Sequence, residues 1–262
     1  MAGERFCRFY VPGDGTERFG VFGRSGGEER VEEVSGGPFG PFERTGLSFA
    51  LGDVRFLPPV KPGSVYCVGR NYAEHASELG NSVPQEPLVF LKPVTSLIGS
   101  GEAIRLPLWA GRIDYEGELA VIIGRRCRNL REDEALDAVL GYICFNDVTA
   151  RELQRKDGQW TRAKGFDTFA PIGPWVLLGG SMEGLGDLVT RVNGVEVQRG
   201  CFADMVFPVG RIISYISSFA TLMPGDVIAT GTPAGVGPLR PGDRVEVFVE
   251  GIGCLSNPCE GC

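Results

Sequence analysis

Apolar and polar positions change in short blocks along most of the chain, and few blocks repeat with the 3.6-residue period of a helix. The stretches VYCVG (65–69), LVFLK (88–92) and GELAVIIG (117–124) predict strands, and we expect the last two to be buried because they are almost continuously apolar. Further strands are predicted at YICFND (142–147), at PWVLL (174–178), and in GDVIATGTP and GDRVEVFVE, which Gly-Asp turns precede.

Helical patterns are fewer and shorter. We expect helices at 72–79, at 132–140, where acidic residues lead, at 148–156 and at 209–222, which is mostly apolar. Strands and helices do not alternate as regular βαβ units, which argues against a doubly wound parallel sheet. The pattern predicts a β-rich α+β fold.

The first 60 residues differ from the rest of the chain. Short alternating pieces such as RFCRFYV and RFGVFG are separated by turns rich in glycine and charge. The segment FLPPVKPGS (56–64) carries three prolines and marks a boundary. We therefore predict a small β-rich domain at residues 1–60 and a larger domain at 61–262.

Composition adds limits to this picture. Hydrophobic residues make up 43% of 262 residues, which suffices for a sizeable core, and 39 glycines with 18 prolines predict many turns. A net charge of −7 and a pI near 5.0 argue against partners such as nucleic acid or an anionic membrane. The sequence shows neither a secretory signal nor an apolar run of the roughly 18 residues that span a bilayer. We expect a cytoplasmic protein.

Eight cysteines are spread along the chain. Five occur singly in apolar or strand-like surroundings, at positions 7, 67, 127, 144 and 201, and predict reduced, buried thiols. The other three lie in GCLSNPCEGC at the end, where a zinc site would lack a nearby fourth ligand. For that tail we expect a frayed terminus without a metal.

The stretch DYEGELAVIIG places acidic residues on one face of a strand. Asp114, Glu116 and Glu118 have the same parity, whereas Leu119, Val121 and Ile123 point to the other face. Adjacent carboxylates repel each other unless a cation neutralises them or one stays protonated. A solvent-facing strand without any function would also show this pattern, so the residues alone leave both interpretations open.

A third carboxylate follows a predicted strand in FNDVTARELQ. Asp147 stands where a helix N-cap is expected, and Arg151 and Gln154 would share its helical face at i+4 and i+7. The simple interpretation is an Asp N-cap worth about 1 kcal/mol. Three carboxylates without histidine or thiolate would instead suit Mg²⁺ or Mn²⁺, with Ca²⁺ as the third candidate, whereas zinc prefers nitrogen or sulfur.

Two further residues are candidates for catalysis. Lys164 lies among small and aromatic residues in WTRAKGFDTF, and near three carboxylates it would balance charge and hold a substrate oxygen. His75 is the only histidine, and Glu78 follows at i+3 on the same helical face. From the residues alone His75 is a metal ligand, a base or a surface residue. The glycine-rich stretch ATGTPAGVG (229–237) lacks the P-loop ending, although its threonines could bind a small carboxylate.

Seven stretches together resemble the fumarylacetoacetate hydrolase (FAH) family. They are, in chain order, GRNYAEHASELG, PLVFLKPVTSLIGSG, DYEGELAVIIG, GYICFNDVTARELQ, AKGFDTFAPIGPW, VNGVEVQ and MPGDVIATGTPAGVG. The resemblance covers about residues 63–258, and residues 1–60 resemble the small leading domain of many bacterial members. It implies an FAH-type mixed β-roll or β-sandwich core with few helices, and a homodimer.

The resemblance also implies roles for individual residues. By their positions in these motifs, Glu116, Glu118 and Asp147 would bind the divalent metal, Lys164 would lie beside it, and His75 with Glu78 would form a catalytic pair on a short, movable helix. The positions implied to contact substrate are Arg70, Asn71, Arg151, Gln154 and Thr230. The cysteine-containing tail departs from the family pattern.

Family substrates are 2-oxo acids or their enols, so the resemblance implies a metal-dependent enzyme for such compounds. Our first expectation is hydrolysis of a C–C bond in an acylpyruvate-like substrate. The second is isomerisation or decarboxylation of a 2-hydroxydienoic or 2-oxo diacid, of the 2-hydroxyhepta-2,4-diene-1,7-dioate or oxaloacetate type, in aromatic catabolism. Dehydration of a sugar-derived 2-oxo acid is third. A homologue that binds metal without turnover is the alternative of another class.

Overall fold

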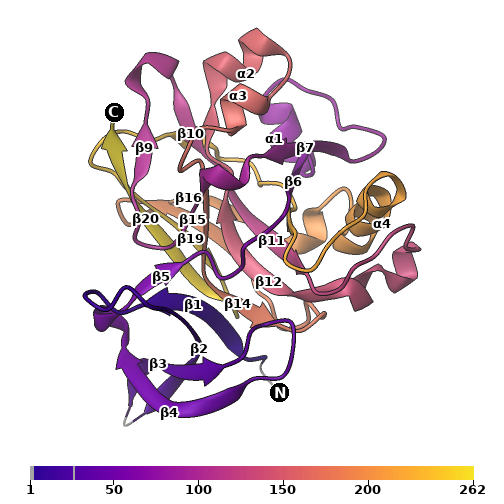
Figure 1. Cartoon of the computed structure of the whole chain (residues 1–262). Helices are drawn as coiled ribbons and strands as arrows, with labels where there is room; N and C mark the ends of the chain where they lie inside the picture. Colours follow the sequence, from indigo (N-terminus) through magenta and orange to yellow (C-terminus); the bar gives the residue numbers. More distant parts are fainter. Residues whose placement is uncertain (1–2, 26) are drawn as a thin grey trace.

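The computed structural model describes residues 3–25 and 27–262, and strands dominate it (Figure 1). Its main sheet has twelve strands, ten of them in the order β4-β3-β2-β1-β14-β12-β11-β17-β6-β7, while β5 pairs with β1 and β8 pairs with β14. These strands are β1 (Arg5–Tyr10), β2 (Glu17–Ser25), β3 (Glu28–Ser35), β4 (Glu43–Ala50), β5 (Arg55–Leu57), β6 (Val65–Gly69), β7 (Leu88–Lys92), β8 (Leu97–Ile98), β11 (Gly117–Ile123), β12 (Val139–Asn146), β14 (Ala170–Leu178) and β17 (Val227–Ala229).

Two smaller sheets complete the β structure. The three-stranded sheet has the order β13-β10-β18, and the five-stranded sheet has the order β16-β15-β19-β20-β9. Their strands are β9 (Ile104–Leu106), β10 (Ile113–Tyr115), β13 (Thr149–Ala150), β15 (Leu188–Val192), β16 (Val195–Gly200), β18 (Gly237–Pro238), β19 (Arg244–Val249) and β20 (Gly253–Gly261). The predicted β-rich α+β fold is confirmed.

Helices are short and gather on one side of the sheets. Figure 1 shows α1, α2 and α3 close together at the top of the molecule and α4 at its right. The α-helices are α1 (Ala73–Glu78), α2 (Arg151–Asp157), α3 (Thr161–Lys164) and α4 (Val209–Phe219). The 3₁₀ helices are η1 (Leu51–Asp53), η2 (Val94–Ser96), η3 (Leu108–Ala110), η4 (Glu132–Ala138) and η5 (Phe202–Asp204). Within the described ranges, every helix is too short or too polar to cross a bilayer.

Strand β11 lies inside the main sheet and is buried along its whole length. Alternate side chains serve two different parts of the core: Leu119, Val121 and Ile123 join the largest apolar cluster, whereas Ala120 and Ile122 join another on the opposite face. This is the alternation that the sequence predicts for a strand buried on both faces. It fixes which way Glu118, one residue before Leu119, can point.

The first 60 residues are continuous with the main sheet. Strand β1 pairs with β14, and its residues Cys7 and Phe9 belong to the same apolar cluster as core residues of the larger part of the chain. The ring centroids of Phe22 and Trp175 lie 4.6 Å apart across this junction. Residues 1, 2 and 26 of the predicted domain lie outside the described residues. The boundary at 60/61 remains a prediction, and what the structure adds is one sheet that crosses it.

Several sequence predictions of local structure are wrong in detail. LVFLK is an edge strand rather than a buried one, and Leu91 is 54% exposed. The segment 132–140 forms a 3₁₀ helix that ends at Ala138, and strand β12 begins at the next residue. Cys201 is exposed because it lies in the loop after β16. The C-terminal tail is not frayed: it forms β20, which pairs with β9 and β19 and buries Cys259.

The predicted helix at 148–156 begins later than expected. Thr149 and Ala150 form β13, which pairs with β10, so that α2 starts only at Arg151 and its N-cap is Ala150. Asp147 therefore lies outside the helix and is not its N-cap. The pairing of β13 with β10 holds this backbone extended, and the Asp147 side chain is left for other contacts.

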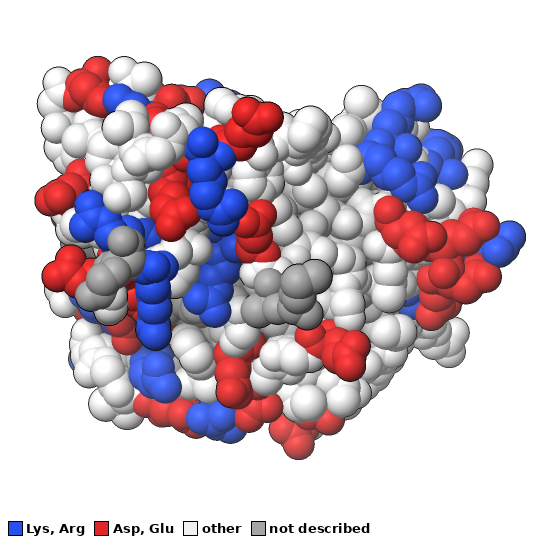
Figure 2. Space-filling view, turned by 90° about the horizontal axis from the view of Figure 1, so that it is seen from below, with Lys and Arg blue, Asp and Glu red and all other residues white. Residues whose placement is uncertain are grey.

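The surface formed by the N-terminal strands carries mixed charge. Figure 2 shows Lys and Arg side chains interleaved with Asp and Glu on the left of this view, beside a broad uncharged area. Arg24 pairs with Glu29 at 3.1 Å, and Arg44 pairs with Glu4 at 2.8 Å. Such exposed pairs contribute little to stability, about 0–1 kcal/mol each.

Candidate active site

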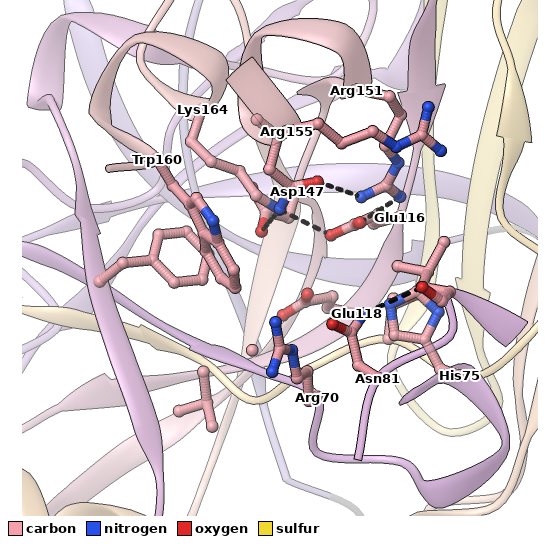
Figure 3. Close-up of a pocket in the computed structure, with 16 residues that line it drawn as sticks. Arg70, His75, Asn81, Glu116, Glu118, Asp147, Arg151, Arg155, Trp160 and Lys164 are labelled. Atoms are coloured by element: carbon pink, nitrogen blue, oxygen red, sulfur yellow. Dashed lines mark hydrogen bonds and ion pairs between the residues drawn. The ribbon is translucent and has the colours of Figure 1, made fainter. Parts of the chain in front are cut away.

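One pocket of about 240 Å³ lies between α1 on one side and α2 with α3 on the other (Figure 3). Its walls come from the end of β6, from α1, from β7, from the start of β11, and from the segment that contains α2 and α3. These segments are far apart in sequence, and the parallel pairing of β6 with β17, together with the antiparallel pairing of β17 with β11, brings them together. The volume suits a small metabolite, below the usual range for drug-sized ligands.

Three carboxylates meet at the floor of this pocket. Glu116 lies between β10 and β11, Glu118 is the second residue of β11, and Asp147 follows the neighbouring strand β12. One ligand oxygen from each lies within 4.8 Å of the others, and all three residues are at most 4% exposed. The Asp147 backbone N–H donates to the Glu116 carbonyl at 2.8 Å, which fixes the two segments against each other.

Lysine side chains neutralise part of this acidic cluster. Lys164 Nζ donates to Glu116 Oε2 at 2.8 Å and to Asp147 Oδ2 at 2.6 Å. Lys92 Nζ donates to the other oxygen of Asp147 at 2.6 Å and to the Val148 carbonyl at 3.1 Å. An ammonium group has three N–H donors, so Lys164 keeps one for a ligand.

Arg151 completes the neutralisation from α2. It donates to Glu116, to Asp114 Oδ2 at 2.8 Å, and to Gln154 Oε1 at 3.0 Å. Asp114 is also bound by Arg112 at 2.7 Å. Asp114 is therefore used in an ion-pair network beside the pocket, although it has the same parity as the two glutamates.

The acidic cluster is electrostatically unequal. Burial raises the pKa of Glu118 well above its ordinary value, and Asp147 and Glu116 add to the shift by repulsion. Burial also acts on Glu116, but Arg151 and Lys164 outweigh it and lower the pKa of that carboxyl. Within the described ranges, Glu118 receives a single hydrogen bond, from Gly231 N–H at 2.8 Å. When no cation is bound, burial and the two neighbouring carboxylates therefore favour the neutral form of Glu118.

This donor set fits a hard divalent cation. All three side chains offer oxygen, and the cluster is buried. A bound cation would also offset the burial and repulsion that raise the pKa of Glu118. Oxygen-only sites of this kind select Mg²⁺, Mn²⁺ or Ca²⁺ over zinc. Glu116, Glu118 and Asp147 are thus the residues that could hold a metal.

His75 and Glu78 lie on the opposite side of the pocket, on α1. His75 Nδ1 is 3.3 Å from Glu78 Oε2, and His75 is 5% exposed and lines the pocket. If Nδ1 carries the proton, Nδ1–H donates a hydrogen bond to the Glu78 carboxylate, and the unprotonated Nε2 can act as a base. Glu78 is held in turn by Gly235 N–H, at 3.1 and 3.2 Å from its two oxygens. The dyad predicted from sequence is therefore brought together.

The residues predicted to contact substrate separate into two groups. Arg70, Arg151 and Gln154 line the pocket. Asn71 and Thr230 lie behind it. The Asn71 amide donates to the Phe207 and Thr230 carbonyls at 3.0 and 2.7 Å, and the Thr230 hydroxyl donates to the Leu119 carbonyl at 2.8 Å. Both side chains fix loops around the pocket, and their contact with substrate stays a prediction.

Sequence reasoning missed other residues of the site. Lys92, Phe90 and Trp160 were not singled out, although a lysine that ends an apolar strand was a usable signal. The Phe90 ring lies 4.9 Å from Lys164 Nζ, and it meets Trp160 edge-on at 5.2 Å. Together these side chains form an aromatic wall beside the acidic cluster.

Replacing Lys92 by methionine is expected to lower the free energy of unfolding of the metal-free protein by about 3 kcal/mol, because it leaves a buried Asp147 oxygen without its cation. Saturating Mg²⁺ should reduce this loss, since a bound cation supplies the missing charge. Urea unfolding with EDTA and with Mg²⁺ measures both. The matched control is Lys61→Met at an exposed pair with Glu17, expected to change stability by less than about 0.5 kcal/mol. Equal losses at both lysines would contradict the buried ion pair.

Comparison with known proteins adds independent findings. The family model described as fumarylacetoacetate (FAA) hydrolase C-terminal matches residues 64–260. A second model, described as Rv2993c-like, N-terminal, matches residues 4–59.

Named relatives and solved structures cover most of the chain. A 5-carboxymethyl-2-hydroxymuconate delta-isomerase from Mycobacterium smegmatis is 43% identical, with a TM-score of 0.89 over 98% of this chain and 100% of that one. A 2-hydroxyhepta-2,4-diene-1,7-dioate isomerase from Mycobacterium marinum is 42% identical, with a TM-score of 0.89 over 98% of both chains. A 2,4-didehydro-3-deoxy-L-rhamnonate hydrolase from a Sphingomonas species is 41% identical over 79% of this chain and 77% of its own.

Proposed function

Because the chain belongs to the fumarylacetoacetate hydrolase family, we propose that it is a divalent-metal-dependent enzyme that acts on 2-oxo acids or their enols. The observation that carries the proposal is the pocket itself. Three buried carboxylates and Lys164 form one side of it, and His75, which is paired with Glu78, lies on the other. We further propose Mg²⁺ or Mn²⁺ as the ion, and a cytoplasmic homodimer as the working form.

The preferred reaction is hydrolysis of the C–C bond of an acylpyruvate-like substrate. Glu116, Glu118 and Asp147 would hold the metal, which when bound supplies Lewis-acid stabilisation of negative charge on the substrate's oxygens. The free N–H of Lys164 would donate to the same oxygens and stabilise the charge as it develops.

His75 would act as the base for the attacking water. Its Nε2 takes a proton from water while Glu78 orients the ring and stabilises the imidazolium. The hydroxide adds to the acyl carbonyl carbon, and the bond from that carbon to the neighbouring carbon of the pyruvate unit then breaks. The electron pair stays on the pyruvate unit as an enolate, which recovers a proton from His75.

Isomerisation of a 2-hydroxydienoic diacid is the second candidate. It is favoured by the names of two solved structures that resemble nearly the whole chain at 42–43% identity. The same base would remove and return a proton without an attacking water. Decarboxylation of a 2-oxo diacid would need the metal site alone.

A panel of substrates tests the proposal. We expect an acylpyruvate such as acetylpyruvate to lose its ultraviolet absorbance in the presence of Mg²⁺ or Mn²⁺ and to be stable with EDTA. Oxaloacetate and a 2-hydroxydienoic diacid, followed by product analysis, separate hydrolysis from decarboxylation and isomerisation. Metal binding without turnover on the whole panel would favour a non-catalytic homologue.

A further inference from the structure

From the contacts around Arg70 we infer that this residue determines specificity by binding a second carboxylate of the substrate, so that the preferred substrate is a 2-oxo acid with an additional acidic end. This inference rests on the proposed function, in which the 2-oxo acid end is held at the acidic cluster. It adds the chemistry of the other end. Figure 3 shows Arg70 across the pocket from Lys164 and Arg151, beside Trp160.

The charges in the pocket leave Arg70 without a partner. In and beside the pocket, the four carboxylates of Asp114, Glu116, Glu118 and Asp147 are matched in number by the cations of Lys92, Arg112, Arg151 and Lys164, while Arg155, which also lines the pocket, is exposed to solvent. A divalent cation adds two positive charges, and a 2-oxo acid bound as its enolate brings two negative ones. Within residues 3–25 and 27–262, the Arg70 guanidinium makes no ion pair and no hydrogen bond. A half-buried guanidinium in a balanced site calls for an anion from the ligand.

The backbone at Arg70 has an unusual conformation. Its φ is +59°, a left-handed conformation that costs free energy for a residue with a side chain. The next residue, Asn71, is fully buried, and its amide group is bonded to Phe207 N–H and to two carbonyls. These bonds hold the backbone in the strained conformation and direct the residue at the pocket. Strain that is maintained by its surroundings is typical of functional positions.

An aromatic surface supports the guanidinium. Arg70 Cζ lies 5.9 Å from the centroid of the Trp160 ring. The ring can come this close because Gly69 has no side chain: a Cβ there would lie 2.8 Å from Trp160 Cζ3. Stacking on Trp160 restricts the planar guanidinium, which reduces the entropy that is lost when it binds a carboxylate with two parallel hydrogen bonds.

Another arginine of the pocket wall differs in exposure, in ring contact and in backbone conformation. Arg155 lines the pocket from α2 but is exposed, and within the described ranges it is neither stacked on a ring nor in a left-handed conformation. It therefore serves as the comparison in the test. Arg126, exposed in the loop after β11 and remote from the pocket lining, is the second control.

The test uses pairs of unreactive 2-oxo acids that differ only in the terminal carboxylate. 2-Oxoglutarate is compared with 2-oxopentanoate, 2-oxoadipate with 2-oxohexanoate, and 2-oxopimelate with 2-oxoheptanoate, by calorimetric binding to the Mg²⁺-loaded protein. We expect the unmodified protein to prefer the diacid of at least one pair by about tenfold to a hundredfold, the worth of a charge-assisted pair. Arg70→Asn, chosen because asparagine tolerates a positive φ, should remove the preference and leave binding of the monoacid unchanged. Arg70→Lys should retain part of it.

The outcomes distinguish failure of the inference about Arg70 from failure of the proposed function. Equal binding of diacid and monoacid by the unmodified protein overturns the inference, as does an Arg70→Asn variant that weakens both alike. If Arg155→Asn loses more of the preference for the diacid than Arg70→Asn does, the second carboxylate is bound by Arg155, and the inference is overturned. Arg126→Asn should behave like the unmodified protein. If no 2-oxo acid binds to the metal-loaded protein, the proposed function fails, and the inference fails with it.

Discussion

Glu118→Gln will remove metal-dependent turnover while the metal-free protein stays folded. Glu118 contributes one of three buried carboxylates, and the amide keeps its shape without its charge. We expect kcat on the best substrate to fall at least about a thousandfold, the worth of several kcal/mol of lost charge stabilisation. Mn²⁺ binding, measured by calorimetry, should weaken about a hundredfold.

The raised pKa of Glu118 predicts the sign of the effect on stability. In the metal-free protein, burial and the repulsion of Asp147 and Glu116 raise the pKa of this carboxyl and favour its neutral form, which glutamine resembles in shape and charge. Urea unfolding in EDTA should therefore show no loss of stability, whereas Mg²⁺ should stabilise the variant less than the unmodified protein. Glu183→Gln, at an exposed position remote from the pocket, is the matched control. Full activity of Glu118→Gln after chelation would show that the metal assignment is wrong.

His75→Ala is expected to abolish hydrolysis while folding and metal binding persist. The imidazole is the only one in the chain, and it is paired with Glu78 at the pocket wall. Loss of a general base costs about 10²–10⁴-fold in rate. Hydrolysis of an acylpyruvate gives the rate, thermal unfolding reports the fold, and Mn²⁺ titration reports the metal site.

A double variant tests whether the two side chains act as one unit. Glu78→Gln alone should slow hydrolysis less than His75→Ala, and the double variant should be no slower than His75→Ala, because Glu78 acts only through the ring. Residual decarboxylation of oxaloacetate is compatible with this mechanism, since that reaction needs no activated water. Hydrolysis at the unmodified rate in His75→Ala would end the assignment of the base.

The sequence was most informative where one periodicity held over a whole element. In the segment 117–123 every apolar residue was needed on one face or the other, so the strand and the direction of Glu118 followed from parity alone. A pattern that is compatible with two different local structures was misleading. The run LVFLK predicts burial, yet it forms the last strand of the sheet, because an apolar run does not reveal whether a further strand lies beside it.

Asp147 shows how tertiary pairing overrides local preference. An aspartate before a helical pattern is a good N-cap. Here, however, Thr149 and Ala150 pair with β10 as strand β13, so the helix begins only at Arg151. The carboxylate was correctly expected near the two glutamates, although the local geometry given for it was wrong. The resemblance to a family placed it better than the helical pattern did.

The counterions and the aromatic wall could not be read from spacing. Phe90, Trp160 and Asp147 come from three different segments, and only the assembled sheet brings them to one pocket, where Lys92 bonds to Asp147. Asn71 and Thr230 illustrate the reverse case, because both stand in motifs of the resemblance, yet their polar groups are bonded to the backbone behind the pocket. Such a difference depends on side-chain direction, which a motif does not contain.

The pairing of β1 with β14 has a consequence for how the chain folds as it is synthesised. The first strand leaves the ribosome early, but its partner at residues 170–178 follows more than 150 residues later. Strand β5 can already pair with Arg8–Tyr10, but at about 5–20 residues per second the part of β1 at Arg5 and Phe6 stays without its partner for on the order of ten seconds or longer. An unpaired strand edge can pair with other chains in that interval. We therefore expect the fragment that ends at residue 60 to self-associate when it is produced alone.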